Sequence, residues 1–288
     1  MGLFVISSKR IADLHLRSEG CADSAPGTAP LISRAVPSDA REARRLAVTE
    51  AAADARACTS TAPDAPFACI LTTVEEKLGV AVIIAQLGPG IAGLYSPIRG
   101  GVLLVNGKDT PVRRRFTLAH ELGHHWLGHG ERLVTEEMVS APYEPPEVDA
   151  NQFAAEFIAP QEAVEEYVDS LADASPTLEL VCRVSNYFAV SAYMARIRLE
   201  TCGVITDSAT IGRLDAQIAN KEAKPIYESL ELKDRDDECA TPDHELPRLP
   251  ASATGTALHD LVSGEMSVSE FAELSGIPEE QVASVFTS

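Results

Sequence analysis

The clearest alternation of apolar and polar positions lies between about residue 72 and about residue 203. TVEEKLG (73–79) has the pattern of a helix that ends at its glycine. Three apolar runs rich in β-forming residues follow, separated by Gly and Pro: VAVIIAQL (80–87), AGLYSPI (92–98) and GVLLVNG (101–107). Short runs bounded in this way are typical of strands. We therefore predict a small antiparallel sheet.

Helices are predicted after these strands. PVRRRFTLAHELGHHWLGHG (111–130) has a proline suited to a first helical turn, and Gly128 or Gly130 is expected to end the helix. In EVDANQFAAEFIAP (147–160), apolar residues recur every three or four positions until a proline ends the run. Weaker helical patterns follow at 161–173, 177–188 and 191–201. A small sheet packed with helices predicts an α+β fold class.

Composition divides the chain into four segments. The N-terminal part contains an Ala/Pro/Ser/Gly-rich stretch and then a helical pattern from Ser38 to Arg56, whereas KDRDDECATPDHELPRLP (233–250) is acidic and punctuated by prolines. The last segment has short helical patterns without Lys or Arg. We predict a partly helical or disordered extension, a main domain with a trailing helical segment, an acidic linker and a small acidic helical module: 1–60, 61–205, 206–250 and 251–288.

The composition favours a globular protein and disfavours a nucleic-acid reader. Of 288 residues, 45% are hydrophobic, and 24 Lys and Arg against 43 Asp and Glu give a formal net charge of −19. This charge repels phosphate backbones, so we expect no direct contact with nucleic acid. No apolar run reaches the roughly 18 residues of a membrane span, and the N-terminus lacks the apolar core of a signal peptide. We therefore expect a cytoplasmic protein without a membrane partner.

The strongest chemical signal is an H-E-x-x-H motif formed by His120, Glu121 and His124 on the first predicted helix. Residues four apart lie on one face of a helix, so both imidazoles can bind one tetrahedral Zn²⁺. Glu121 then lies beside the open coordination position, where it can accept a proton from water that attacks a peptide carbonyl. The spacing thus predicts metal ligands at His120 and His124 and a catalytic base at Glu121, with Mn²⁺ or Fe²⁺ as substitutes for zinc.

A catalytic zinc site needs a third protein ligand, and the second predicted helix supplies the best candidate. Glu147 shares the inward stripe of that helix, whereas Asp149 lies on a half-polar side. Asn151, one turn after Glu147, is placed to orient a ligand by a hydrogen bond. His125 and His129 are rotated away from His124, and we expect both to face solvent. Glu147 is therefore the predicted third ligand.

These segments together resemble the ImmA/IrrE family of zincin-type metallopeptidases. The resemblance rests on RRRFTLAHELGHHWLGH (113–129), the preceding GVLLVNG, the following EVDANQFAAEFIAP and the later SNYFAVSAYMARIRLETCGVI (185–205). It covers residues from about 72 to about 203, and FIAP (157–160) departs from the usual family pattern of two leucines followed by Met-Pro. By this resemblance His120, His124 and Glu147 match the zinc ligands and Glu121 matches the catalytic base, in a zincin-like core.

The resemblance also implies a function. Members of the family are intracellular regulatory proteases that cleave a DNA-binding transcriptional repressor, often of the helix-turn-helix kind, in response to stress or mobile-element signals. We expect a zinc-dependent endopeptidase with such a protein substrate, which could pair with one edge of the 92–106 hairpin. The alternative is a non-proteolytic antirepressor or binding module that retains a structural zinc, although Glu121 would then be unneeded.

Two further motifs are notable for their charge. Arg113, Arg114 and Arg115 begin the first predicted helix and could form either a basic patch or ion pairs with the abundant acids. SVSEFAELSGIPEEQVASVF (267–286) imitates a helix-turn-helix, but its second helix carries two glutamates and would not approach phosphates. We expect this C-terminal module to be a protein-docking or autoinhibitory cap, or else a plain packing element.

Overall fold

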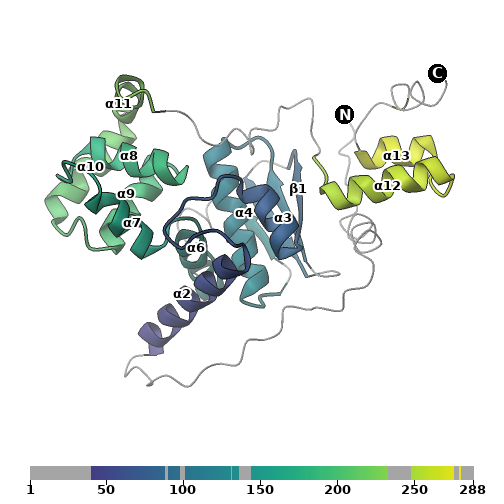
Figure 1. Cartoon of the computed structure of the whole chain (residues 1–288), viewed down its shortest axis with the longest axis horizontal. Coiled ribbons are helices and arrows are strands. Elements are labelled where there is room, and N and C mark those ends of the chain that lie inside the picture. The colour runs from purple at the N-terminus through teal and green to yellow at the C-terminus, as the bar shows by residue number, and fades with distance from the viewer. Residues whose placement is uncertain are drawn as a thin grey trace.

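The computed structural model describes residues 40–87, 90–97, 101–130, 132–135, 144–232, 248–275 and 279 (Figure 1). A four-stranded sheet is covered by helices, and a cluster of further helices lies to one side. The predicted α+β fold class is confirmed. Residues 1–39 and 233–247 lie outside the described residues, so the structure does not address the parts of the predicted extension and linker that fall there.

The sheet has the order β1-β3-β2-β4, and it is mixed. Its strands are β1 (Ala81–Ala85), β2 (Ile91–Ser96), β3 (Val102–Asn106) and β4 (Arg132–Thr135). β2 pairs antiparallel with β3 and β4, but β1 pairs parallel with β3. The prediction of a wholly antiparallel sheet is therefore wrong for this pair. In the sheet, β3 lies between β1 and β2, and it runs parallel to β1 and antiparallel to β2.

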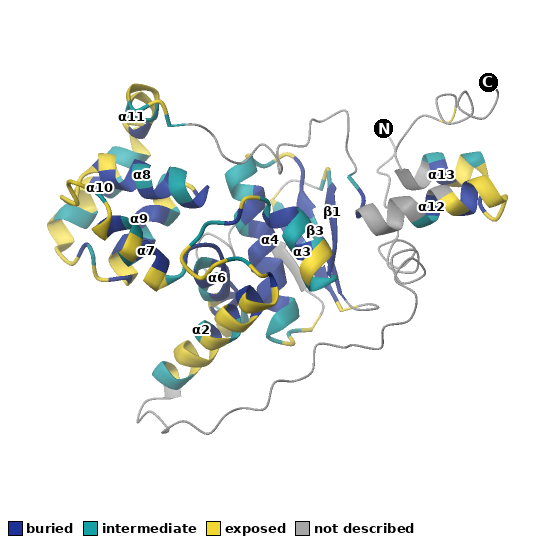
Figure 2. Ribbon diagram, viewed as in Figure 1, coloured by how far each residue is buried: buried dark blue, intermediate teal, exposed yellow. Residues whose placement is uncertain are grey.

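Both faces of the sheet are covered, which explains why β1 and β3 consist almost wholly of apolar residues (Figure 2). Val82 and Ile84 of β1 belong to the main core, whereas the alternate residues Ala81 and Ile83 belong to a second cluster with the C-terminal helices. These helices are α12 (Ala251–Ser263) and α13 (Val268–Ser275). The described part of the C-terminal module therefore packs on the sheet face opposite the main core.

Arg248, just before α12, binds the edge strand β1 through its backbone and its side chain. Its backbone exchanges two hydrogen bonds with Ile84, of 2.8 and 3.0 Å. Its guanidinium donates to the carboxylate of Glu75, with 2.6 Å between Nη2 and Oε2, and to the carbonyl of Val82. The charged pair is only partly exposed, so it is less screened by water than a surface pair. The outer edge of β1 is thus paired at Ile84 with a residue that precedes the C-terminal helices.

The main core lies around α4 (Pro111–Trp126) and α6 (Pro145–Ile158), which pack closely against each other. Gly123 permits the approach, because a Cβ at this position would lie 3.2 Å from the backbone of Ala150. Both helices begin with proline in the first turn, where the missing N–H costs no hydrogen bond. This close pair of helices carries the candidate site.

An N-terminal helix, α2 (Ala40–Cys58), lies along α6 and corresponds to the predicted pattern at 38–56. Arg44 of α2 forms an ion pair with Asp149 of α6, with 2.6 Å between Nη2 and Oδ2. The short helix α3 (Ile70–Leu78) ends at Gly79, whose φ of +65° is the left-handed conformation that glycine adopts easily. The predicted end of that helix is therefore correct.

Five more helices follow α6: α7 (Gln161–Asp169), α8 (Leu178–Phe188), α9 (Ala192–Thr201), α10 (Ser208–Ala219) and α11 (Ala223–Ser229). The first three correspond to the predicted helices. The last two lie where we expected an acidic linker, because Ile211, Leu214 and Ile218 recur at helical spacing within a polar composition. Among the described helices, none is both long and apolar enough to cross a membrane.

Candidate metal centre and catalytic carboxylate

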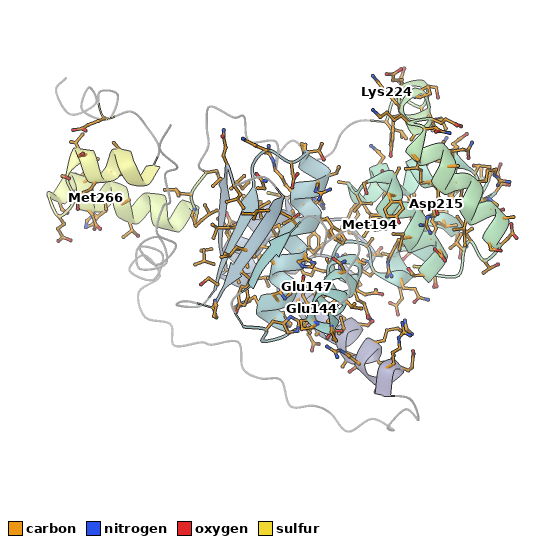
Figure 3. The ribbon with its side chains drawn as sticks, turned by 180° about the vertical axis from the view of Figure 1, so that it is seen from behind. Glu144, Glu147, Met194, Asp215, Lys224 and Met266 are labelled. Atoms are coloured by element: carbon orange, nitrogen blue, oxygen red, sulfur yellow. The ribbon has the colours of Figure 1, made fainter. Side chains whose placement is uncertain are left out.

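The two histidines of the H-E-x-x-H motif lie one turn apart on α4, and Glu147 faces them from the first turn of α6. All three side chains are completely buried between the two helices, and Glu147 is labelled in Figure 3. Three ligand atoms face a common centre. His120 Nε2 and His124 Nε2 are 3.0 Å apart, and Glu147 Oε2 lies 3.2 Å from His120 Nε2 and 3.4 Å from His124 Nε2. The structure therefore brings together the three residues predicted as ligands.

These distances fit one tetrahedral ion. Zinc ligands at about 2.0–2.1 Å from the metal lie about 3.3 Å from each other, which is close to the three separations observed. Among the described residues, these three form the one cluster of His, Cys, Asp and Glu side chains that could hold a metal. The donor set of two imidazoles and a carboxylate suits Zn²⁺ and leaves a fourth position open.

Asn151 determines which nitrogen of His120 faces the cluster. The Nδ1 atom of His120 lies 2.8 Å from the side-chain oxygen of Asn151, so this nitrogen must carry the proton and donate it. The Nε2 atom of the neutral ring then presents a lone pair to the cluster, as a metal ligand must. The predicted orienting role of Asn151 agrees with this contact.

His129 makes the equivalent contact to His124, and the sequence analysis missed it. The Nδ1 atoms of the two rings are 2.8 Å apart, so His129 can accept the proton of His124 and leave its Nε2 free for a metal. His129 is half-buried, and the expectation that it faces solvent was wrong.

A helix-ending motif brings His129 into this position. The N–H of His129 bonds the carbonyl of His124, the N–H of Gly128 bonds that of His125, and Gly128 has φ +70°. These are the hydrogen bonds of a Schellman motif, which turns the chain back over the last helical turn. A glycine that ends the helix, followed directly by histidine, was the sequence signal for this contact.

His125 is also half-buried, contrary to expectation, but it points away from the cluster. Its ring packs edge-on against Tyr95 of β2, with 5.7 Å between the ring centres, and burial lowers its pKa. A Cβ at Gly101 would lie 2.7 Å from its Nδ1 atom, so the chain before β3 passes close to the ring. His125 therefore contacts the sheet and contributes nothing to the metal cluster.

Glu121 lies beside the cluster, between α4 and β2, and is completely buried. Neither carboxylate oxygen has a hydrogen-bond partner among the described residues. Burial, and secondly the charge of Glu147, raise the pKa of Glu121 well above its usual value. A buried carboxylate without a partner is costly and requires an explanation.

Gly93 makes the space for this carboxylate. A Cβ at this position of β2 would lie 2.3 Å from Glu121 Oε1 and 2.9 Å from the carbonyl oxygen of Leu104. Any larger residue would displace Glu121 or separate the strands. Gly93 is thus a second residue of the site that sequence reasoning missed.

Glu147 is held in its charged form by the histidines. Burial acts to raise its pKa, but the contacts of its carboxylate with the rings of His120 and His124 outweigh this effect and lower the pKa. Asp149 points elsewhere and pairs with Arg44. The register argument that favoured Glu147 over Asp149 therefore agrees with the structure.

The three consecutive arginines of α4 do not form an exposed basic patch. Arg114 and Arg115 are buried, and they donate to backbone carbonyls of Asp109 and Phe67 respectively. Arg113 forms an ion pair with Asp109, with 3.4 Å between Nε and Oδ2. These contacts fix the first turns of the helix that carries His120.

Fold and site together define a metallopeptidase domain with an H-E-x-x-H helix. Residues 75–200 match the model of the Peptidase_M78 family, described as the IrrE N-terminal-like domain. The match is to the ImmA/IrrE metallopeptidase family over these residues, and it confirms the resemblance found in the sequence. No curated protein matches the chain significantly.

Proposed function

We propose that the chain is a zinc-dependent endopeptidase in which His120, His124 and Glu147 hold the metal and Glu121 is the general base. The observation that carries this proposal is the pairing of a three-ligand cluster with a buried, unpartnered carboxylate on the same helix. A structural zinc site would not need Glu121, and its burial would only destabilise the fold.

The chain's own residues have defined parts in the reaction. When bound, a divalent cation at the cluster polarises the substrate carbonyl and lowers the pKa of water. Glu121 accepts the proton of the attacking water and delivers it to the leaving amine. Asn151 and His129 hold the two imidazoles in the orientation that ligation requires.

A substrate in extended conformation can pair with β4. The 92–106 hairpin, our first candidate, is paired on both sides, since β3 lies between β1 and β2 and β2 lies between β3 and β4. β4 is the end strand of the sheet on the side of β2, which carries Gly93 next to Glu121. Its outer edge therefore replaces the hairpin as the proposed docking edge.

We further propose that the substrate is a DNA-binding transcriptional repressor, of the helix-turn-helix kind, and that cleavage derepresses stress or mobile-element genes in the cytoplasm. Support comes from the match to the ImmA/IrrE family and from the net charge of −19, which disfavours direct DNA binding by the chain itself.

The test uses helix-turn-helix repressors found among the genes next to the one that encodes this protein. Zinc-loaded protein and purified repressor are incubated together, and products are identified by mass spectrometry. The proposal expects one defined cut with the wild type and none with Glu121→Gln, while that variant keeps its zinc. If Glu121→Gln relieves repression as well as the wild type does, the chain acts as a non-proteolytic antirepressor.

A further inference from the structure

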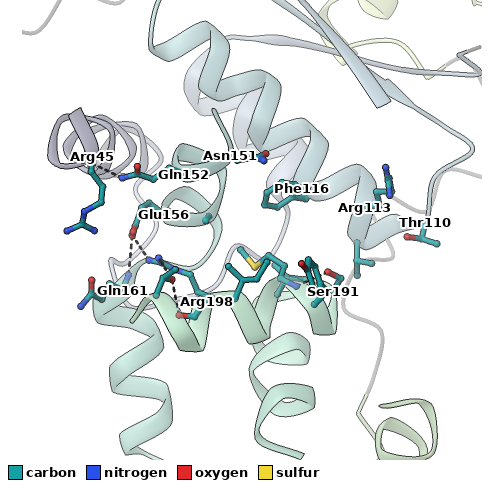
Figure 4. A pocket seen from close by; sticks show the side chains of 17 residues that line it. Arg45, Thr110, Arg113, Phe116, Asn151, Gln152, Glu156, Gln161, Ser191 and Arg198 are labelled. Atoms are coloured by element: carbon teal, nitrogen blue, oxygen red, sulfur yellow. Dashed lines mark hydrogen bonds and ion pairs between the residues drawn. The ribbon is translucent and has the colours of Figure 1, made fainter. Parts of the chain in front are cut away.

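A cavity of about 630 Å³ lies between α4, α6 and α9 (Figure 4). Its volume falls within the range of about 300–1,000 Å³ that is typical of ligand sites. The apolar part of its wall comes from all three helices and the turn before α9: Val112, Phe116, Ala155, Val190, Met194 and Ile197. The cavity is large enough to hold more than one apolar side chain.

The cavity is a neighbour of the candidate metal centre. Phe116 lies one helical turn before His120 on α4, and Asn151 lies one turn after Glu147 on α6. Asn151 borders the cavity and also accepts the hydrogen bond from His120. His120 and Glu147 themselves are fully buried and do not border it. The cavity is therefore a separate site that continues along the same pair of helices.

The charges around the cavity favour an uncharged occupant. Each of the three arginines that border it already has an acidic partner, in the pairs Arg45–Glu42, Arg113–Asp109 and Arg198–Glu156. A charged ligand would have to compete with these pairs, and it would lose its own hydration beside an apolar wall. Apolar groups, in contrast, gain free energy from leaving water.

The rim of the cavity is open to solvent. Tyr193, at its edge on α9, is 50% exposed although it is a large aromatic residue. A small molecule would remain partly in water at this rim, whereas a polypeptide could place side chains inside and continue across the surface. The open rim and the shared helices together favour a segment of a polypeptide.

We propose that this cavity receives large uncharged apolar side chains of the polypeptide substrate, an assignment that rests on the proposed function. Val112 and Phe116 precede His120 by eight and four residues, which places them about 6–12 Å from it along the helix axis. An extended peptide advances about 3.3 Å per residue, so the occupying residues lie roughly two to four positions from the bond that is cleaved.

A binding assay tests the cavity without requiring cleavage. The probe is N-phenyl-1-naphthylamine, an uncharged fluorophore, titrated into the full-length zinc-loaded protein. Saturable binding of one probe per chain is expected. Ala155→Phe puts a ring into the cavity and should weaken binding about tenfold or more. The matched control is Ala219→Phe, at an exposed alanine of α10, which should leave binding unchanged.

Ile197→Gln is a second variant with nearly the same volume, and it should also weaken probe binding because it makes the wall polar. Thermal unfolding of each variant shows whether the fold is intact. The proposal is overturned if the wild type shows no saturable binding. It is also overturned if the folded Ala155→Phe and Ile197→Gln variants bind the probe as tightly as the wild type does.

Peptide competition identifies the kind of occupant. Acetylated and amidated hexapeptides rich in Leu and Phe should displace the probe, and serine-rich peptides of the same length should not. Displacement by small apolar compounds but by neither peptide would overturn the polypeptide assignment. The same titration with Glu121→Gln separates the cavity assignment from the proposed peptidase function. This variant should lose cleavage and keep peptide binding. Cleavage that folded Ala155→Phe performs at the wild-type rate would contradict the cavity assignment alone.

Discussion

Replacement of Gly93 by alanine tests whether the position of Glu121 matters for catalysis. The new Cβ would lie 2.3 Å from Glu121 Oε1, and ordinary contact begins at 3.4 Å, so this oxygen must move by about 1 Å. A displacement of that size can reduce the rate about 100-fold when it affects a reacting group. The metal ligands are not among the atoms that the Cβ would meet, so zinc content should remain at one per chain.

The same substitution should lower stability moderately. The Cβ would also lie 2.9 Å from the carbonyl oxygen of Leu104, which is backbone and cannot move independently of β3. Overpacking of this kind costs about 1–3 kcal/mol, which corresponds to a fall of roughly 2–12 °C in Tm. Gly93 has no unusual φ, so backbone strain should add nothing.

The assay compares zinc content, Tm and the initial rate of substrate cleavage for the wild type, Gly93→Ala and Gly212→Ala. Gly212 is the matched control, because a Cβ there meets nothing within 4 Å and the residue is exposed on α10. Full cleavage activity in Gly93→Ala, at unchanged zinc content, would refute the role given to Glu121. Loss of zinc would show instead that the substitution disturbs the whole site.

Three further outcomes are expected. His129→Ala should weaken zinc binding about 10–100-fold in a chelator competition, because His124 loses its orienting partner, and exposed His259→Ala should not. Arg248→Met should lower the free energy of unfolding in urea by about 1–3 kcal/mol, since Glu75 loses its partner; an unchanged value would contradict the contact. Removal of zinc by EDTA should lower Tm, because an ion that binds only the folded chain stabilises it by about 2.7 kcal/mol at 100 times its Kd.

Much of the site could be predicted because helical spacing is a local property. The four-residue interval between His120 and His124 places both rings on one face wherever the segment is helical. The choice of Glu147 over Asp149 needed only the apolar stripe of the second helix. Both arguments depend on one helix at a time, and neither requires knowledge of how the helices pack.

The residues that were missed depend on contacts between distant segments. Gly93 is one glycine within an apolar strand, and its significance comes from Glu121 lying against it from another element. A simple meander would place β2 between β1 and β3, whereas the sheet has β3 between β1 and β2. This order likewise depends on which strands can be covered on both faces, a property of the whole fold. β4 has only four residues and is held by backbone pairing to β2, so its sequence carries little signal.

Charge and composition were least informative at the C-terminal end. The acidic composition of 206–250 suggested a linker, but apolar residues at helical spacing within it form α10 against α9. The apolar residues of α12 and α13 were recognisable, whereas the sheet face that they cover was not. Amphipathic patterns show that a helix has a partner, but they do not show which partner it has.

The metal content of the purified protein tests the central claim most directly. Elemental analysis of the wild type, Glu147→Gln and the matched control Asp149→Asn, each loaded with zinc and then gel-filtered, reports whether the cluster of His120, His124 and Glu147 holds an ion. The account predicts one zinc per chain in the wild type and in Asp149→Asn, and much less in Glu147→Gln. A wild type without stoichiometric metal, or a Glu147→Gln variant that retains it fully, would contradict the account.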